Sequence, residues 1–433
     1  MSLYPDQLKV AEDFKTWLFE SNIPFAGLFA GGGYGKSHMV GYLLEILKKT
    51  DLPVVVTSMT HVAAEVLADF TGNPVSTLHS AFGWYLEECT ETGKVLLMSP
   101  EKSPIQHGSV IIVDEAGMVN NQVLAALIDA ATAFDLRILG VGDNKQTFPV
   151  EKDGVPTGVP FYDHCKVRFT LGIPKRQSEG DIVFALCQRM RQSVDGGRFP
   201  NFKTIEQGDG RGVYDSDDFT DDIIKAYDAA SSPDQVKVLS YTNKKAIKYN
   251  KIIRKHVLGV DTNEPQVGEE LVANTTIKEY DNEAGGDVII IANNERVTVL
   301  GTEAGEEWGL SGWWTRIVNF DKDEYTVFVP ESPAVKDREL KKLSREAKEA
   351  KAEGKSGVAR YCWGEYFNVL NKTADLRPTF AITVTKSQGS TYEHVLVDLN
   401  DIDRCWDRET KARLAYTAVS RASKKVTVDG YLV

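Results

Sequence analysis

Hydrophobic and polar positions divide the first half of the chain into short apolar runs that alternate with helical patterns. The apolar runs predict five β-strands, at Phe25–Ala30, Pro53–Ser58, Ser109–Val113, Arg137–Gly142 and Val167–Leu171. Apolar residues at helical spacing predict helices between them, at Lys36–Lys49, His61–Phe70 and Asn121–Phe134. Because strands that alternate with helices form βαβ units, we expect a mostly parallel sheet with helices on both faces.

A second set of the same kind begins near Arg176. Its first part predicts a helix at Ser178–Gln192, a strand at Lys237–Ser240 and a helix at Asn243–His256. The set resumes with the segments Thr379–Val384, His394–Asp398, Lys411–Arg421 and Lys425–Asp429. The fold class is therefore α/β, with two parallel sheets.

The segment between the two parts of this second set has a different pattern. Short alternating runs separated by Gly, Asn and Asp turns predict a small antiparallel β-barrel, with strands at Asp287–Ala292, Glu295–Leu300, Trp314–Val318 and Glu324–Val329. The charged segment Lys336–Lys355 follows, and its apolar stripe consists of Leu340, Leu343, Ala347 and Ala350. It is either a solvated surface helix or an arm that leans on DNA or on the other half of the protein.

A smaller insertion interrupts the first sheet. Trp84–Glu88 and Lys94–Ser99 flank a Thr-Glu-Thr-Gly turn, which is typical of a β-hairpin. We therefore expect a first α/β domain over 1–80 and 106–175, with the hairpin insertion at 81–105. A second α/β domain spans 176–266 and 376–433, and the barrel with its arm occupies 267–375.

Composition narrows the class of protein. The chain has 433 residues, of which 42% are apolar and 26% charged, the balance of a globular protein with two to four domains. No apolar run is long enough to span a membrane, and the N-terminus lacks a secretory signal. Five scattered cysteines without a Cys-x-x-Cys pair favour a reducing cytoplasm. The net charge of −12 argues against a protein that coats nucleic acid, but it permits a narrow basic channel.

A phosphate-binding loop is predicted between the first strand and the first helix. The residues Ala30-Gly31-Gly32-Gly33-Tyr34-Gly35-Lys36-Ser37 follow a strand and open a helix, which is the context of a P-loop. The glycines allow backbone N–H groups to surround phosphate oxygens at the positive end of the helix dipole. Lys36 is expected to reach the β- and γ-phosphates, and Ser37 to hold Mg²⁺.

A second motif provides carboxylates for hydrolysis. The apolar run Val110–Val113 predicts a buried strand, and Asp114 and Glu115 lie at its C-terminal end, where ligands bind in α/β proteins. Asp114 is expected to bind Mg²⁺ and Glu115 to polarise the attacking water. Gln146, in Gly142-Asp143-Asn144-Lys145-Gln146 after the next strand, is a candidate sensor of the γ-phosphate.

In order, the chain contains AGGGYGKS, TSMTHVAA, STLHS, DEAGM, GDNKQ, PKRQ, SYTN, TVTKSQGST and YTAVSRA. This ordered set resembles superfamily 1 DNA helicases, in particular the Dda and RecD branch, which moves 5′ to 3′ on single-stranded DNA. The resemblance implies two RecA-like P-loop domains, a pin formed by the inserted hairpin, and an SH3-like barrel with a protruding arm. It also implies ATP and Mg²⁺ as cofactors, and single-stranded and forked DNA as partners. A single-stranded DNA-binding protein as a further partner and a monomeric state follow from the same resemblance.

The resemblance also assigns roles to single residues around the nucleotide. Gln7 lies where the family reads the adenine edge. Arg176 and Arg421 occupy its two arginine-finger positions, and Gln388 occupies the position that couples nucleotide to DNA. On residue type alone, a single arginine is more often a surface residue.

The DNA-facing positions of the family fall mostly on short polar side chains, which bind phosphates without reading sequence. They are Thr57, Thr60, His61, Ser76, Thr77, His79, Thr242, Asn243, Lys386 and Thr391. The two histidines are either stacking groups or structural residues. Phe148 and Pro149 form either a base wedge or a packed loop.

Three other functions stay open on the sequence. One is a translocase that strips proteins from single-stranded DNA but unwinds poorly, and a second is a nucleotide-gated DNA-binding module. The third is a P-loop kinase. The inserted hairpin argues against the translocase, Glu115 with two candidate arginine fingers argues against the module, and the second sheet argues against the kinase.

Overall fold

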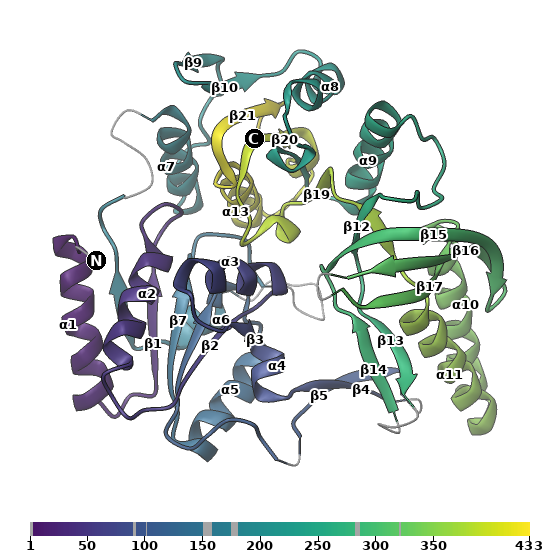
Figure 1. Ribbon diagram of the computed structural model, residues 1–433, viewed down its shortest axis with the longest axis horizontal. Coiled ribbons are helices and arrows are strands. Elements are labelled where there is room, and N and C mark those ends of the chain that lie inside the picture. The colour runs from purple at the N-terminus through teal and green to yellow at the C-terminus, as the bar shows by residue number, and fades with distance from the viewer. Residues whose placement is uncertain are drawn as a thin grey trace. The chain divides into compact units, whose positions relative to one another are not determined.

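The computed structural model describes residues 3–89, 92–100, 102–149, 158–174, 181–281, 286–319 and 322–433. The chain forms two compact units (Figure 1). The first unit contains Met1–Tyr85, Ser99–Ala246 and Ala381–Val433, and the second contains Leu86–Met98 and Ile247–Phe380. The domain boundaries that we expect from the sequence stay predictions.

The first α/β half of the first unit has a six-stranded sheet in the order β3-β2-β6-β7-β1-β8, with every neighbouring pair parallel. Its strands are β1 (Phe25–Phe29), β2 (Val54–Ser58), β3 (Ser76–Thr77), β6 (Val110–Asp114), β7 (Arg137–Gly142) and β8 (Val167–Thr170). Its helices are α1 (Pro5–Glu20), α2 (Lys36–Leu47), α3 (His61–Thr71), α4 (Leu78–Phe82), α5 (Asn121–Phe134), α6 (Pro160–His164) and the 3₁₀ turn η1 (Ala116–Met118). All five predicted strands and all three predicted helices are confirmed.

Helix α1 is an element that the sequence pattern had not led us to predict. Its buried side chains Val10, Phe14 and Trp17 pack with those of β1, α2 and β6 in one core. The Trp17 indole N–H also donates a hydrogen bond of 2.7 Å to the carbonyl of Ile23. These apolar residues recur at spacings of three and four, so the sequence did contain the signal for this helix.

The second α/β half has a six-stranded sheet in the order β19-β11-β20-β21-β10-β9, in which only β9 is antiparallel to its neighbour. Its strands are β9 (Ile205–Gln207), β10 (Arg211–Asp215), β11 (Val236–Ser240), β19 (Ala381–Thr383), β20 (Tyr392–Asp398) and β21 (Ala422–Asp429). Its helices are α7 (Ile182–Val194), α8 (Phe219–Ala229), η2 (Pro233–Gln235), α9 (Asn243–Leu258), η3 (Thr385–Ser387), α12 (Leu399–Ile402) and α13 (Arg408–Val419). The predicted second parallel sheet is confirmed, although β9, β10, α8 and α12 were not predicted.

The second unit is built on antiparallel strands, as the alternating pattern predicted. Its five-stranded sheet has the order β17-β16-β15-β12-β18. These strands are β12 (Glu270–Ala273), β15 (Arg296–Glu307), β16 (Leu310–Val318), β17 (Glu324–Pro330) and β18 (Leu376–Pro378). The described residues also form two ribbons, β4 (Tyr85–Cys89) with β5 (Lys94–Met98) and β13 (Ile277–Asp281) with β14 (Gly286–Ile291). Closure of the sheet into a barrel stays a prediction.

The charged segment forms helix α10 (Pro333–Ala352), which lies beside a helix that we did not predict, α11 (Ser356–Lys372) (Figure 1). Ala347 of its apolar stripe is fully buried and packs with Trp363 and Phe367 of α11. The charged residues on the other side, such as Arg345 and Lys348, are exposed. The segment is therefore a solvated helix with one packed face, and a contact with DNA stays a prediction. No helix within the described ranges is long and apolar enough to cross a membrane.

Candidate functional site

The loop between β1 and α2 has the form of an anion-binding cradle. Gly33 and Gly35 have φ angles of 81° and 82°, a left-handed conformation that glycine adopts without strain. A side chain on Gly31 would approach the ring of Tyr34 to 3.0 Å. The Lys36 ammonium donates hydrogen bonds of 2.9 and 3.1 Å to the carbonyls of Ala30 and Gly31. The backbone amides and the N-terminus of α2 can therefore receive phosphate oxygens, with the Lys36 ammonium beside them.

The carboxylates of Asp114, the last residue of β6, and of Glu115, which follows it, lie at the same edge of the sheet as this loop. In the strand order, only β7 separates β6 from β1, so Asp114 and the loop come from nearby strand ends. Removal from water and the charge of Glu115 raise the pKa of Asp114, and the charge of Lys36 opposes this shift. The Asp114 and Glu115 carboxylates, with the Ser37 hydroxyl at the start of α2, are hard oxygen ligands of the kind that Mg²⁺ prefers.

Helix α13 of the second half docks on the loop that follows β7 of the first half. The Tyr416 hydroxyl donates a hydrogen bond of 2.6 Å to the buried carboxylate of Asp143. Arg413 donates to the carbonyls of Asn144 and Gln146, at 2.6 and 3.0 Å. The backbone N–H of Thr147 donates to the hydroxyl of Thr417, at 3.0 Å. The spacing of three and four residues places these α13 side chains on one helical face, but the sequence did not indicate what that face contacts.

Two residues that the sequence placed far apart meet in this region. Gln388, which follows η3, donates from its Nε2 to the Oε1 of Gln146 at 3.5 Å, and both side chains are buried. The Oε1 of Gln388 has no partner among the described residues. The structure thus brings the candidate γ-phosphate sensor and the candidate coupling residue together, while their roles stay predictions.

Only one of the two candidate arginine fingers lies in the described residues, because Arg176 falls outside them. Arg421 is 6% exposed, and its guanidinium donates to the carbonyls of Thr417 and Ser390. It also donates to the Ser420 hydroxyl at 2.9 Å. In this conformation the Arg421 side chain is held by its own half. Ser420, beside it, reaches the phosphate loop: its Cβ lies 3.9 Å from the position of a Cβ on Gly32.

Comparison with known proteins agrees with this arrangement of two α/β halves. Residues 3–168 match the AAA domain family, and residues 378–428 match the UvrD-like helicase C-terminal domain family. Over 414 residues, 90% of each chain, the sequence is 24% identical to the ATP-dependent DNA helicase dda of Enterobacteria phage T4. A stretch of 120 residues is 35% identical to the ATP-dependent DNA helicase PIF4 of Trypanosoma brucei brucei, and covers 26% of this chain and 14% of that protein.

The fold is shared with solved helicase structures. A Pif1 helicase from Bacteroides, in complex with ADP-AlF3 and ssDNA, superposes with a TM-score of 0.54 at 13% identity, over 100% of this chain and 94% of that chain. The sequence similarities and the family matches together support a Dda/Pif1-like helicase of superfamily 1. The fold of two RecA-like α/β halves that the ordered motifs predicted is thereby confirmed, and the predicted family is supported.

Several of the predicted DNA-facing residues also have a local structural role. The hydroxyls of Thr60 and Thr77 accept hydrogen bonds from the backbone N–H groups of Ala63 and Ser80, so they cap α3 and α4. Thr57 is completely buried, and its hydroxyl donates to the carbonyl of Ile112 at 2.9 Å. The structure does not support a DNA contact by Thr57, because its side chain is not exposed.

The remaining candidates differ in exposure. The side chains of His61, Asn243 and Thr391 are exposed, and Ser76 and Lys386 are half-buried. His79 packs against Trp84 with ring centres 6.1 Å apart, and burial lowers its pKa. The backbone N–H and the hydroxyl of Thr242 both donate to the carboxylate of Asp401. DNA contacts by these residues stay predictions.

Two further predicted sites, the Phe148-Pro149 segment and Gln7, lie in packed surroundings. Phe148 has the guanidinium of Arg413 over its ring, 4.1 Å from the centre, and Pro149 is buried, which favours the packed-loop interpretation over a base wedge. Gln7 is 1% exposed, and its Oε1 accepts a hydrogen bond from the backbone N–H of Tyr4 at 3.2 Å, so it caps α1. Its contact with adenine stays a prediction.

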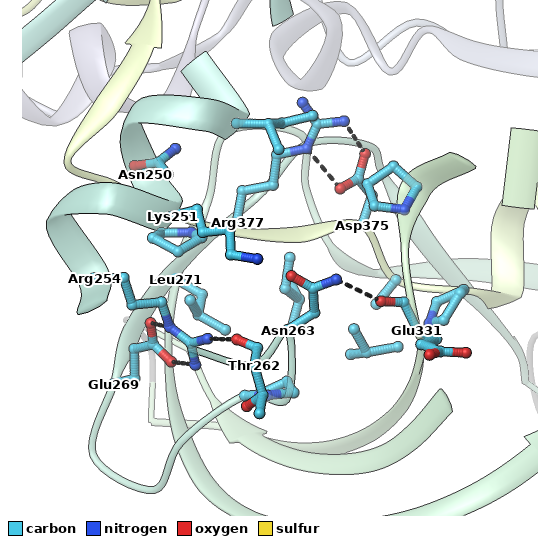
Figure 2. A pocket seen from close by; sticks show the side chains of 18 of the residues that line it. Asn250, Lys251, Arg254, Thr262, Asn263, Glu269, Leu271, Glu331, Asp375 and Arg377 are labelled. Atoms are coloured by element: carbon cyan, nitrogen blue, oxygen red, sulfur yellow. Dashed lines mark hydrogen bonds and ion pairs between the residues drawn. The ribbon is translucent and has the colours of Figure 1, made fainter. Parts of the chain in front are cut away.

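The second unit contains a cavity of about 130 Å³ between α9, β17 and the segment around β18 (Figure 2). The polar groups in its wall pair with one another: Arg254 with Glu269 and the carbonyl of Thr262, and Arg377 with Asp375 (Figure 2). The Lys336 ammonium donates to the carbonyls of Leu370 and Thr373, and burial lowers its pKa to about 8. These pairs hold the sheet, α9 and α10 together, so we interpret the cavity as structural.

Proposed function

We propose that this chain is an ATP-driven motor that moves 5′ to 3′ along single-stranded DNA and separates duplex strands at a fork. The observation that carries the proposal is the docking of α13 on the loop after β7, beside the phosphate loop. A nucleotide bound at that loop lies where residues of both α/β halves meet, so its hydrolysis can change how the halves fit together. ATP-dependent DNA helicase activity is also what the relatives dda and PIF4 are named for.

In this proposal the first half binds and activates the nucleotide. The amides of Gly31–Gly35 and the Lys36 ammonium bind the phosphates, and Ser37 and Asp114 hold Mg²⁺. Bound Mg²⁺ supplies positive charge that offsets the charge developing on the transferred phosphoryl group. Glu115 orients the attacking water and accepts its proton. Gln7 contacts the adenine edge, with Tyr34 beside the loop.

The second half responds to the terminal phosphate. Arg421 and Arg176 gain a partner only while the γ-phosphate is present, which favours a closed arrangement of the halves. Gln146 and Gln388, already in contact, transmit the change to the DNA-facing segments. There the candidates Thr60, His61, Thr77, His79, Thr242, Asn243, Lys386 and Thr391 hold the DNA backbone.

The β4–β5 hairpin is the proposed pin. Its turn residue Gly93 packs directly against the ring of Trp363 on α11, where a Cβ would overlap the ring. A hairpin supported in this way is stiff enough to resist the incoming strand, whereas an isolated two-stranded hairpin is only marginally stable. A monomeric state, the 5′-to-3′ direction and a single-stranded DNA-binding protein as partner rest on the family resemblance alone.

The deciding experiment is steady-state ATPase activity with and without single-stranded DNA, on the wild type and on Glu115→Gln. We expect strong stimulation by DNA, and a loss of about 100-fold or more in Glu115→Gln because the water loses its general base. Glu12→Gln, an exposed carboxylate on α1, serves as the matched control and should behave as wild type. Turnover that is indifferent to DNA would instead favour a nucleotide-gated binding module.

Forked duplexes then test the finer claims. We expect unwinding of forks that carry a 5′ single-stranded tail and none of those that carry only a 3′ tail. Translocation without strand separation, read from displacement of a protein bound to single-stranded DNA, would identify the protein-stripping translocase.

A further inference from the structure

Arg191 brings a cationic side chain from the second half to the phosphate loop of the first. It lies on α7, and its Nε is 3.4 Å from the position of a Cβ on Gly31. That Nε is buried and has no hydrogen-bond partner among the described residues. A buried donor without an acceptor is destabilising, and phosphate oxygens are the acceptors that this loop is built to receive.

The other end of the Arg191 guanidinium has a weak partner. Its Nη2 lies 3.5 Å from the Oδ1 of Asp143, at the outer limit of a hydrogen bond. Asp143 already accepts stronger hydrogen bonds from the Tyr416 hydroxyl at 2.6 Å and from the backbone N–H of Lys145 at 3.0 Å. Asp143 therefore orients the Arg191 guanidinium and leaves the Nε–H of Arg191 available as a donor.

We propose that Arg191 is a further nucleotide-binding residue of this site, contributed by the second half, and that its Nε–H binds the terminal phosphate of a nucleoside triphosphate. The proposal rests on the function proposed above and adds a residue that neither the motifs nor the resemblance assigned. Arg421, at an arginine-finger position, is held by carbonyls of its own half in the same structure, whereas Arg191 already lies against the loop.

The terminal phosphate is the expected target because of where Arg191 comes from. Amides of the loop and the N-terminus of α2 surround the inner phosphates, and Lys36 lies beside them. Arg191 comes from the second half, so we expect it to meet the phosphate that projects beyond the loop. A charge-assisted contact of this kind favours the triphosphate over the diphosphate, so Arg191 would hold the halves together before hydrolysis and release them afterwards.

The test is equilibrium binding of fluorescent ADP and of a fluorescent, non-hydrolysable ATP analogue to the full chain with Mg²⁺ and without DNA. We expect Arg191→Ala to weaken the ATP analogue about 10- to 100-fold and ADP by less than about 3-fold. Arg189→Ala, which removes an exposed arginine from the same helix, should leave both affinities unchanged. Where Arg191→Ala does not fold, Arg191→Met keeps the aliphatic stem and gives the same comparison.

Asp143→Asn distinguishes a phosphate contact from a purely structural role. If Arg191 acts only through its pair with Asp143, Asp143→Asn will reproduce the whole selective loss of the ATP analogue seen in Arg191→Ala, and the proposal is wrong. If Arg191 binds the phosphate itself, Asp143→Asn, which keeps Arg191, will weaken the ATP analogue by a clearly smaller factor. Equal weakening of both nucleotides, or no weakening, would also overturn it. Because the assay contains no DNA, failure of this proposal leaves the DNA-dependent motor untouched, and a chain that binds no nucleotide at all would defeat both.

Discussion

His394 on β20 links the stability of the second α/β half to pH. Its Nε2 lies 2.9 Å from the Thr427 hydroxyl, and removal from water lowers its pKa from 6.5 to about 4, with a further contribution from the charge of Lys425. The folded chain therefore keeps His394 neutral at a pH where the unfolded chain has already protonated it. Between pH 6.5 and pH 4 the unfolded state binds more protons, so stability falls as the pH falls.

We predict that this residue contributes about 2–3 kcal/mol of pH-dependent unfolding free energy across that range. Replacement by glutamine, which can keep a hydrogen bond to Thr427 but does not titrate, should flatten the profile by that amount. Denaturant unfolding of the wild type and His394→Gln at pH 7 and pH 4 measures the difference. His107→Gln, at an exposed position, is the control, and parallel profiles for wild type and His394→Gln would contradict the prediction.

At the residue level, the sequence predicted the groups of the phosphate site but few of their neighbours. Lys36 and Asp114 were evident because a glycine-rich loop and an apolar strand precede them directly. Asp143 and Tyr416 carry no such local signal, and they pair across 273 positions of sequence. The burial of Thr57 and the absence of a hydrogen-bond partner for the Arg191 Nε among the described residues likewise cannot be predicted from the sequence.

Helices α10 and α11 show, at the level of elements, that the sequence predicted a packed face but not the element that packs against it. The apolar stripe on α10 predicted a packed face, and Ala347 is indeed fully buried. Its partner α11 was not predicted, although it brings Trp363 and Phe367 to that face. Trp363 packs at the same time against Gly93, so one indole ring connects the helix pair to the hairpin.

We therefore predict that Trp363→Ala loosens the hairpin. Loss of a buried Trp side chain costs about 3–5 kcal/mol locally, and the turn at Gly93 loses its packing partner. Amide hydrogen exchange in 86–98 should accelerate at least 10-fold, and fork unwinding should slow while DNA-stimulated ATPase activity persists. Tyr361→Ala, at a position 68% exposed on the same helix, is the matched control. Unchanged exchange in the hairpin would show that Trp363 does not support it.

In the whole molecule, the candidate nucleotide and DNA residues and the proposed pin belong to different compact units. The P-loop, Asp114, Glu115, Gln146, Gln388 and Arg421 all fall in the first unit, and the hairpin segment Leu86–Met98 falls in the second. We therefore expect that a change confined to the hairpin can lower strand separation while nucleotide turnover is retained. The net charge of −12 is compatible with DNA binding if the basic groups gather along one narrow path.

We predict that replacing Leu86–Met98 with a short Gly-Ser linker leaves DNA-stimulated ATPase activity within about 3-fold of wild type and lowers fork unwinding at least 10-fold. The two ends of the segment lie at the open end of an antiparallel ribbon, so a short linker can join them. ATPase activity on single-stranded DNA is the internal control. Full unwinding by the shortened chain would exclude the hairpin as the pin.

The sequence by itself determined the α/β class, eight elements of the first half, the phosphate loop and the two carboxylates at the end of β6. Each of these depends on residues close together in the chain, where side-chain period and backbone preference act directly. Only the tertiary structure decided that Gln388 meets Gln146, that Tyr416 pairs with Asp143, and that Arg191 lies against Gly31. These contacts depend on how distant strands order themselves within a sheet and on which helix faces pack together. Both are set by burial over the whole fold, so no local stretch of sequence determines them.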